Sequence, residues 1–298
     1  MAGIPEAQLE TWTHEGAGGV AEKTYTSVKA ALNAHTWRDG YAPKFYLQGS
    51  YRNKTNIYGD SDVDVVVQIP NVFRSDLSQL TAEEKAAHQA AYQSSPYQWA
   101  DAHADTLAAL RAHYKVSNVD PGRIAIKAKT PYLPADVVVY LAHRRYTRFI
   151  AIGREEFAPG STIYVPSENR WIINYPKDHY ENGVAKNSAA RTNGWFKPSV
   201  RMFKNAFATM LDRGMLSTDT ALSYAIECFV YNVPDARFGP TWRDTYCNVV
   251  NWAAAGNLST IRRVSEAGPL VGDGPEQWTQ ANAEAFLQGA VDLWTQWE

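Results

Sequence analysis

The sequence has very few cysteines and no long apolar run, and each shortage excludes a class of protein. Two cysteines, Cys228 and Cys247, stand among 298 residues, which is too few for a disulfide framework, so we expect reduced thiols and a cytoplasmic protein. No apolar stretch approaches the roughly 20 residues that a transmembrane helix needs. The start, MAGIPEAQLETW, lacks the basic and apolar regions of a secretory signal, so we expect no membrane association.

An excess of positive charge is also absent. The formal net charge is −2, from 29 Lys and Arg against 31 Asp and Glu, whereas general nucleic-acid binders are usually clearly basic. The chain contains no cluster of cysteines and histidines that could form a zinc site. We therefore expect no nucleic-acid activator. The remaining composition, with 45% hydrophobic and 20% charged residues, is that of an ordinary globular protein.

Local patterns predict an α+β protein with a boundary near residue 165. Residues 6–35 are predicted to be helical with an interruption near GAGG, and residues 44–49 and 62–69 to form strands. Thr81 and Glu84 form a capping box at a helix start. Three strand-like runs follow at 114–119, 123–130 and 135–142, and their short connections favour hairpins in an antiparallel or mixed sheet. A loop-rich stretch with three prolines is expected near 159–176, and helices from Phe196 onward.

Two acids interrupt the predicted strand at 62–69. Asp62 and Asp64 are two residues apart, so their side chains would point to the same face and repel one another. Asp136 repeats the oddity in the run ADVVVY. If the two strands are neighbours, three carboxylates converge, and magnesium would remove the repulsion because it prefers carboxylate and phosphate oxygens. The competing interpretation is a solvated pair of acids; Asp60 is interpreted as a loop residue.

The residues just before these acids favour phosphate binding. In GSYRNKT, Gly49 allows a close approach of the backbone, and Ser50 offers a hydroxyl and an amide to phosphate oxygens. Two magnesium ions, with manganese as a possible substitute, can activate an attacking hydroxyl and stabilise a leaving pyrophosphate. This order of elements indicates nucleotidyl transfer from a nucleoside triphosphate.

The C-terminal half supplies further candidates. Lys204 lies on a predicted helix beside an apolar face and is expected to reach the donor triphosphate, so that its removal weakens binding and leaves thermal stability almost unchanged. For Lys204 and Arg201 the alternative is a solvated cation. Ser223 could donate to phosphate, and Tyr224 could stack on a base or be a core aromatic. Asn174 could contact a base edge or stabilise a turn.

Four stretches together resemble the bacterial CD-NTases, a group of cyclic GMP-AMP synthase-like and DncV-like cyclic oligonucleotide synthases in the polymerase-β-like nucleotidyltransferase superfamily. They are QGSYRNKTNIYGDSDVDVVV, ADVVVY, FKPSVRMFKNAF and SYAIECFVYNVP, in the order found in that family. The resemblance covers most of the chain. One departure is Lys54, where many relatives have glycine, and it puts the conformation of that turn in question.

The resemblance implies a two-lobed fold. Residues 1–165 would form the catalytic core, with a mixed β-sheet and an N-terminal helix bracing both lobes, and residues 166–298 a helical lobe completing the nucleotide-binding cleft. The catalytic metal ligands would be Asp62, Asp64 and Asp136. The nucleotide-binding residues would be Gln48, Gly49, Ser50, Lys204, Ser223 and Tyr224.

The implied activity is synthesis of a cyclic di- or trinucleotide second messenger from NTPs, with release of pyrophosphate. The product would act on a separate effector in antiphage signalling, and the enzyme would be a monomer. One alternative is a transferase that makes linear oligonucleotides or modifies another acceptor. Another is a nucleotide-binding sensor without catalysis, against which the three aspartates argue.

Overall fold

The chain forms two compact units, each of which is discontinuous in the sequence. The computed structural model describes residues 3–16, 18–59 and 62–298, so Asp60 lies outside the described residues. Unit 1 comprises Met1–Ala17, Gly49–Asp60 and Lys177–Glu298, and unit 2 comprises Gly18–Gln48 and Ser61–Pro176. Neither unit is a single stretch of chain on one side of residue 165.

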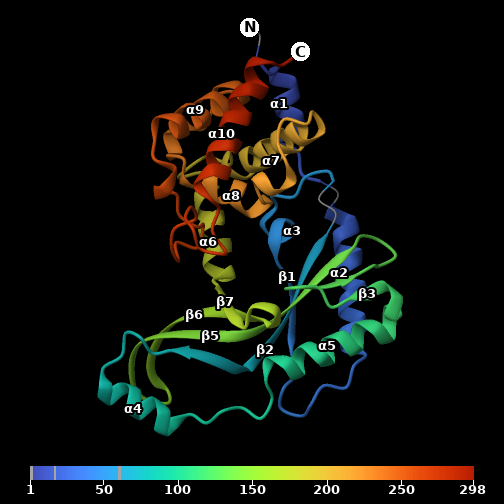
Figure 1. Ribbon diagram of the computed structural model, residues 1–298, viewed down its shortest axis with the longest axis vertical. Coiled ribbons are helices and arrows are strands. Elements are labelled where there is room, and N and C mark those ends of the chain that lie inside the picture. The colour runs from blue at the N-terminus through green and yellow to red at the C-terminus, as the bar shows by residue number, and fades with distance from the viewer. Residues whose placement is uncertain (1–2, 17, 60–61) are drawn as a thin grey trace. The chain divides into compact units, whose positions relative to one another are not determined.

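Unit 2 is built on a mixed sheet, as the sequence predicts (Figure 1). Within the described residues the sheet has seven strands, in the order β1-β2-β5-β4-β3, and β6 continues it from β5 to β7. The β2–β5 pair is parallel and the other pairs are antiparallel. The strands are β1 (Lys44–Leu47), β2 (Val63–Asp76), β3 (Val119–Asp120), β4 (Ile126–Ala128), β5 (Ala135–Ala151), β6 (Arg154–Val165) and β7 (Arg170–Asn174).

Valine-rich runs form the centre of this sheet. Val63, Val65, Val137 and Val139 are at most 1% exposed, which fits the preference of β-branched residues for a buried pleated surface. Helices α2 (Gly18–Asn33) and α5 (Trp99–Tyr114) pack against one another and against the central strands. Helix α4 (Ala82–Ala91) packs on β5, and it begins with the predicted capping box between Thr81 and Glu84.

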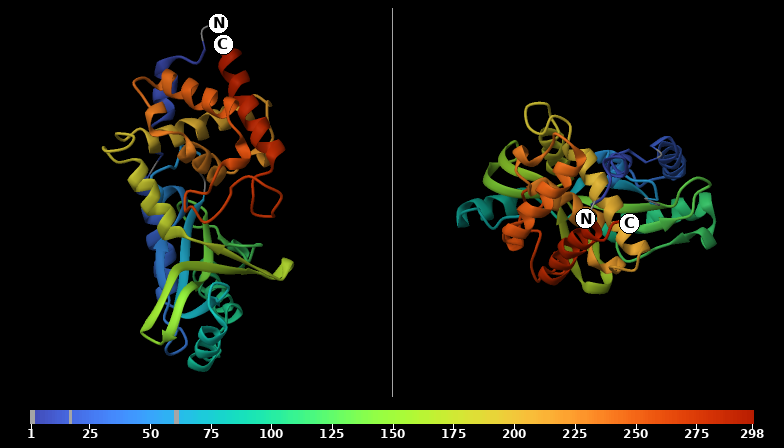
Figure 2. Two further views of the ribbon diagram at one scale, coloured as in Figure 1. Left: turned by 90° about the vertical axis from the view of Figure 1, so that its left-hand side faces the viewer. Right: turned by 90° about the horizontal axis from the view of Figure 1, so that it is seen from above.

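The prediction of a loop-rich region at 159–176 was wrong, because β6 and β7 occupy most of it. The run at 114–119 was also predicted as a strand, whereas most of it is the end of α5 and the 3-10 turn η1 (Val116–Asn118). Pro159 is compatible with β6 because it pairs with β5 only, and β7 joins β6 from Ser161 onward. A proline is tolerated where no neighbouring strand needs its missing N–H. Figure 2 shows the curved hairpin formed by β5 and β6.

Unit 1 is helical, as predicted for the C-terminal half. Its longer helices are α1 (Glu6–Trp12), α6 (Pro176–Lys186), α7 (Phe196–Asp212), α8 (Ser223–Asn232), α9 (Trp242–Ala255) and α10 (Gln280–Thr295). The short helix α3 (Gly49–Asn53) belongs to the same unit. Unit 1 also contains the 3-10 turns η3 (Thr218–Thr220), η4 (Asp235–Arg237) and η5 (Leu258–Thr260), whereas η2 (Pro166–Glu168) belongs to unit 2. The helix predicted over 6–35 is two helices, α1 in unit 1 and α2 in unit 2. No described helix is both long and apolar enough to cross a membrane.

The core of unit 1 is formed by α1, α7, α8, α9 and α10. Val200 and Phe203 on the predicted apolar face of α7 are fully buried, and Phe203 stacks on Tyr246 of α9 with ring centroids 4.9 Å apart. Phe229 of α8 contacts Phe286 of α10 edge-on. These aromatic contacts fix the two helices, α7 and α8, that carry the C-terminal candidate residues.

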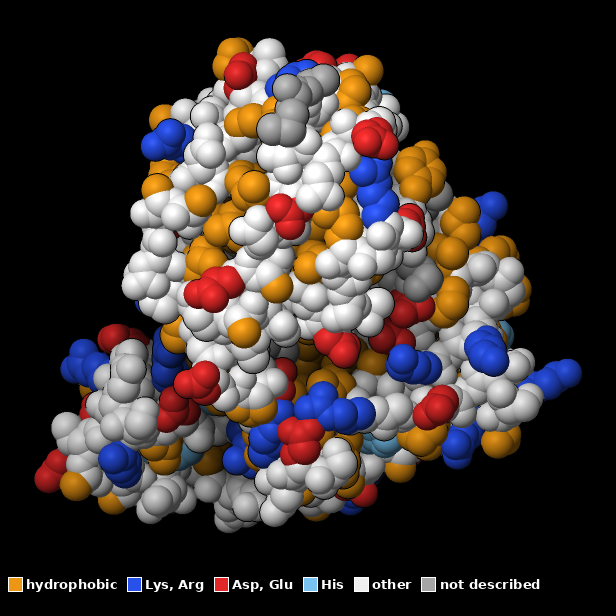
Figure 3. Space-filling view, turned by 45° about the horizontal axis from the view of Figure 1, so that its top comes forward, with side chains coloured by type: hydrophobic (Ala, Val, Ile, Leu, Met, Phe, Trp, Pro, Cys, Tyr) orange, Lys and Arg blue, Asp and Glu red, His pale blue; other side chains and the backbone are white. Residues whose placement is uncertain are grey.

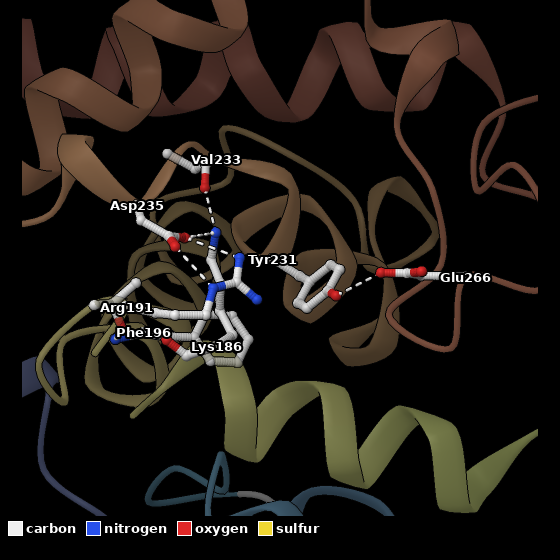
Figure 4. A network of polar contacts seen from close by, with 8 residues as sticks. Lys186, Arg191, Phe196, Tyr231, Val233, Asp235 and Glu266 are labelled. Carbon is white, nitrogen blue, oxygen red and sulfur yellow. Dashed lines mark hydrogen bonds and ion pairs between the residues drawn. The ribbon is translucent and has the colours of Figure 1, made fainter. Parts of the chain in front are cut away.

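A cluster of charged side chains around the buried Lys186 also stabilises unit 1 (Figure 4). Lys186, at the end of α6, is 2% exposed, and its ammonium donates to the Val233 carbonyl at 2.6 Å. It also pairs with Asp235 at 2.5 Å, and the Arg191 guanidinium bonds the same carboxylate at 2.7 Å. The cluster therefore holds the loop after α6 to the turn η4.

Candidate active site

The aspartates of unit 2 lie close together because their strands are neighbours. Asp64 of β2 and Asp136 of β5 are register partners in the parallel pair, so their side chains share one face of the sheet. Both are partly buried, whereas Asp62 is exposed and directly precedes β2. Burial raises the pKa of Asp136, the charge of Asp62 raises it further, and Lys127 of β4 opposes the shift. Asp62 is therefore near enough to Asp136 to influence its ionisation.

The chemistry of these residues fits a magnesium site to which a bound substrate would contribute further ligands. Among the described residues, no three carboxylate, histidine or cysteine side chains are already spaced to hold an ion by themselves. Two carboxylates nevertheless share a face with a third close by, and burial together with the charge of Asp62 disfavours the charged form of Asp136. Carboxylate oxygens are the donors that magnesium prefers, and it usually binds through one or two carboxylates together with substrate phosphates.

Gln48 lies beside these carboxylates within unit 2. Its backbone N–H donates to the Asp64 carbonyl at 3.0 Å, and its side-chain amide donates to the Tyr140 hydroxyl at 3.4 Å. The Oε1 atom of Gln48 is buried and accepts no hydrogen bond from any described residue. Asn174, at the end of β7, donates to the same Tyr140 hydroxyl at 3.1 Å, which gives its side chain a structural contact.

Gly49 and Ser50, two of the phosphate-binding candidates of unit 1, lie in residues 49–55, which we call the GS segment. Gly49 begins α3 with a φ of 68°, in the left-handed region that glycine adopts at little cost. Lys54 follows the helix with a φ of 58°. The lysine thus takes the conformation that glycine would favour at this position. The turn closes with the Thr55 N–H bonded to the Ser50 carbonyl at 2.9 Å.

Lys204 and Arg201 of α7 are not solvated cations. Lys204 is 3% exposed and donates to the Thr55 carbonyl at 2.9 Å. Arg201 is 9% exposed, and its guanidinium donates to the carbonyl oxygens of Thr13 and Lys54. Both side chains therefore bond the backbone of unit 1, and Lys204 directly contacts the GS segment.

Ser223 and Tyr224 occupy the first turn of α8. Ser223 is exposed, and Tyr224 is 42% exposed with its ring 5.5 Å from the ring of His179. Burial raises the pKa of Tyr224, and a contact with Cys228 raises it further. The Tyr224 ring thus contacts His179 and is still partly exposed to solvent. Base stacking by Tyr224 stays a prediction.

Sequence reasoning missed Glu227, which lies one turn after Ser223 on α8. Its carboxylate is 5% exposed and accepts hydrogen bonds from Asn53, Thr55 and His179. The signal was present, because Glu227 is the only charged residue in the apolar helix SYAIECFVYN. The same argument that singled out Asp62 and Asp64 applies to it, since an isolated buried charge is costly.

Comparisons with known proteins identify the family. Residues 181–295 match the model of the cGAS/DncV-like nucleotidyltransferase C-terminal helical domain. The chain is 48% identical over 294 residues to the cyclic UMP-AMP synthase of Rhodothermus marinus, covering 99% of both chains. It is 33% identical over 300 residues to the cyclic nucleotide synthase CdnE01 of Staphylococcus haemolyticus, again covering 99% of both.

Solved structures agree with the sequence comparisons. The Rhodothermus marinus CdnE c-UMP-AMP synthase, solved with Apcpp and Upnpp, superposes with a TM-score of 0.89 at 47% identity, covering 99% of this chain and 97% of that one. The Elizabethkingia meningoseptica CdnE cyclic dinucleotide synthase, solved with GTP and Apcpp, gives a TM-score of 0.73 at 26% identity, covering 97% and 98%. The fold is thus that of a polymerase-β-like nucleotidyltransferase. The chain belongs to the CD-NTase family and is a nucleotidyltransferase that makes cyclic oligonucleotides.

Proposed function

We propose that the enzyme joins one uridine and one adenosine nucleotide into a cyclic dinucleotide, with magnesium as its metal. In each of two steps a ribose hydroxyl oxygen attacks an α-phosphorus, a phosphodiester bond forms, pyrophosphate leaves and the hydroxyl proton is released. The observation that carries the metal chemistry is the register of Asp64 opposite Asp136. The choice of bases is supported by the 48% identity to a cyclic UMP-AMP synthase over nearly the whole of both chains.

Asp62, Asp64 and Asp136 would hold two magnesium ions, for which manganese could substitute. When bound, these ions lower the pKa of the attacking hydroxyl and neutralise charge that develops on the leaving pyrophosphate. Asp136 stands on a separate strand from Asp64, so we assign it mainly to the acceptor side. Asp62 and Asp64 would bind the donor side.

The other candidates would bind the nucleotides. Gly49 and Ser50 would contact phosphate oxygens through backbone amides and the Ser50 hydroxyl, and Lys204 would contribute positive charge. Ser223 would donate to phosphate and Tyr224 would stack on a base. Gln48, beside the Asp64 backbone, would contribute its unpartnered Oε1.

We also propose that the product acts on a separate effector in antiphage signalling and that the enzyme works as a cytoplasmic monomer. Its nucleotide substrates are available in that compartment. On the face shown in Figure 3, Lys and Arg side chains lie interspersed with Asp and Glu side chains. The formal net charge of −2 supports the expectation that no nucleic-acid activator is needed, because nucleic-acid binders are usually clearly basic.

The test is product analysis with all four NTPs and magnesium. Wild-type protein should release pyrophosphate and yield a product of one UMP and one AMP by mass spectrometry. The product should resist phosphatase, because a cyclic dinucleotide has no terminal phosphate. An Asp62→Asn/Asp64→Asn variant is the control and should yield none. A phosphatase-sensitive product would favour a linear oligonucleotide or another acceptor, and a different base composition would refute the uridine and adenosine assignment.

A further inference from the structure

Glu227 is a buried carboxylate with two partners in the GS segment and a third on α6. The Thr55 hydroxyl donates to its Oε2 at 3.1 Å, and the Asn53 amide donates to its Oε1 at 3.3 Å. The third partner, His179 of α6, lies 2.9 Å from Oε1. A carboxylate that is 5% exposed needs such partners, because an uncompensated buried charge is strongly disfavoured.

Positive charge nearby keeps Glu227 ionised. Burial by itself would raise the pKa of Glu227, but His179, Lys204 and the Thr55 hydroxyl together outweigh it and leave the pKa lowered. Lys204 bonds the Thr55 carbonyl at 2.9 Å. Thr55 is therefore held at its hydroxyl by a negative group and at its carbonyl by a positive one.

The contacts connect Glu227 to Ser50 in two steps. Glu227 accepts from Thr55, and the Thr55 N–H donates to the Ser50 carbonyl at 2.9 Å. Arg201 bonds the carbonyl of the intervening Lys54. Arg201 and Lys204 of α7 and Glu227 of α8 thus bond the end of the GS segment. His179 of α6 supports it indirectly, by its contact with Glu227.

We propose that Glu227 is a positioning residue for nucleotide binding, which holds the GS segment in the conformation that presents Gly49 and Ser50 to the triphosphate. The inference rests on the proposed phosphate role of that segment. Glu227 does not itself contact the substrate. Precise placement matters because a binding group displaced by a fraction of an ångström loses much of its contribution.

A purely structural cluster would behave differently, and unit 1 contains one for comparison. Asp235 is more exposed than Glu227 and pairs with Lys186 and Arg191, neither of which belongs to the GS segment (Figure 4). Glu227→Gln and Asp235→Asn both remove a carboxylate charge at nearly constant shape. Both should lower Tm, but only Glu227→Gln should affect nucleotide binding.

The experiment measures Tm for each variant, and KM and kcat for NTP well below the lowest Tm. Glu227→Gln should raise KM about fivefold or more while kcat changes less than twofold. Asp235→Asn should leave KM within twofold of the wild-type value. A wild-type KM in Glu227→Gln, or an equal rise in Asp235→Asn, would overturn the proposal.

Two conservative variants keep the test decisive if Glu227→Gln does not fold. Thr55→Val removes one of the two hydrogen bonds between Glu227 and the GS segment and keeps the side-chain volume, so it should raise KM in the same direction. Thr55→Ser retains the hydroxyl and should keep KM near the wild-type value. Equal KM values in these two variants would contradict a positioning role through Thr55.

A double-mutant cycle with Ser50→Ala separates this inference from the proposed function. If Glu227 acts through Ser50, the KM of the double variant should rise by clearly less than the product of the two single effects. Independent effects that multiply would overturn the inference. An unchanged KM in Ser50→Ala would refute the phosphate role and the inference with it, whereas a raised KM in Ser50→Ala with a wild-type KM in Glu227→Gln would refute the inference alone.

Discussion

Replacing Lys204 by methionine should destabilise the protein, because the ammonium of Lys204 is an internal contact. The side chain is 3% exposed and bonds the Thr55 carbonyl at 2.9 Å. Methionine keeps most of the volume and removes the charge. The sequence alone led us to expect almost unchanged stability for loss of this lysine, and the burial of its side chain reverses that expectation.

The magnitude follows from two losses. A hydrogen bond from a charged donor contributes about 1.5–3 kcal/mol, and the buried carboxylate of Glu227 loses one of the charges that keep it ionised. Breaking a buried pair by removing one partner costs about 3–5 kcal/mol, and Lys204 is only one of several partners. We therefore expect a loss of about 3 kcal/mol in the free energy of unfolding. At roughly 2–4 °C per kcal/mol, Tm should fall by roughly 6–12 °C.

Thermal denaturation of Lys204→Met and Lys177→Met tests this reasoning. Lys177 is the matched control because its side chain is 70% exposed and only 3.8 Å from Glu181 in an i,i+4 pair, a contact worth at most about 0.5 kcal/mol. Lys204→Met should also raise KM for NTP, and Lys177→Met should not. A Tm for Lys204→Met within 2 °C of the control would refute the buried contact.

Three further predictions concern the aspartates, the turn at Lys54 and the acid stability of the protein. Asp62→Asn/Asp64→Asn should abolish pyrophosphate release and magnesium-dependent NTP binding, whereas Asp136→Asn should lose turnover but retain some NTP binding. Equal loss of NTP binding by the two variants in a nucleotide titration would contradict this division of roles. Lys54→Gly should leave Tm unchanged or slightly higher, and Lys54→Val should lower stability by about 1–2 kcal/mol, because the φ of 58° suits glycine and not a β-branched residue. The lowered pKa of Glu227 gives stability that is present above its ordinary value of 4.5 and lost as pH falls through the lower folded value. Tm measured across this acidic range should therefore fall less steeply in Glu227→Gln than in the wild type, and parallel curves would show that Glu227 is not ionised in the folded protein.

Elements with a strong local pattern could be predicted from the sequence. The valine runs around Asp64 and Asp136 indicated the two central strands, because β-branched residues favour buried sheets whatever their partners. The capping box between Thr81 and Glu84 was also confirmed. Its hydrogen bonds join residues that are only three apart, so a local sequence pattern is enough to predict it. The aspartates were recognised because a charge next to or within an apolar strand needs an explanation, although their convergence depended on the pairing of β2 with β5.

Only the tertiary structure decided which polar side chains are buried and what they contact. Glu227 bonds Thr55 across 172 residues of chain, and Lys204 bonds the same residue across 149, distances over which no sequence period carries information. The assignment of residues 49–60 to the helical unit depends on such contacts too. Local propensity fixes the conformation of a segment. The environment of a charge depends instead on chain segments that folding brings together. Burial then determines whether a lysine is a surface residue or part of the framework of the site.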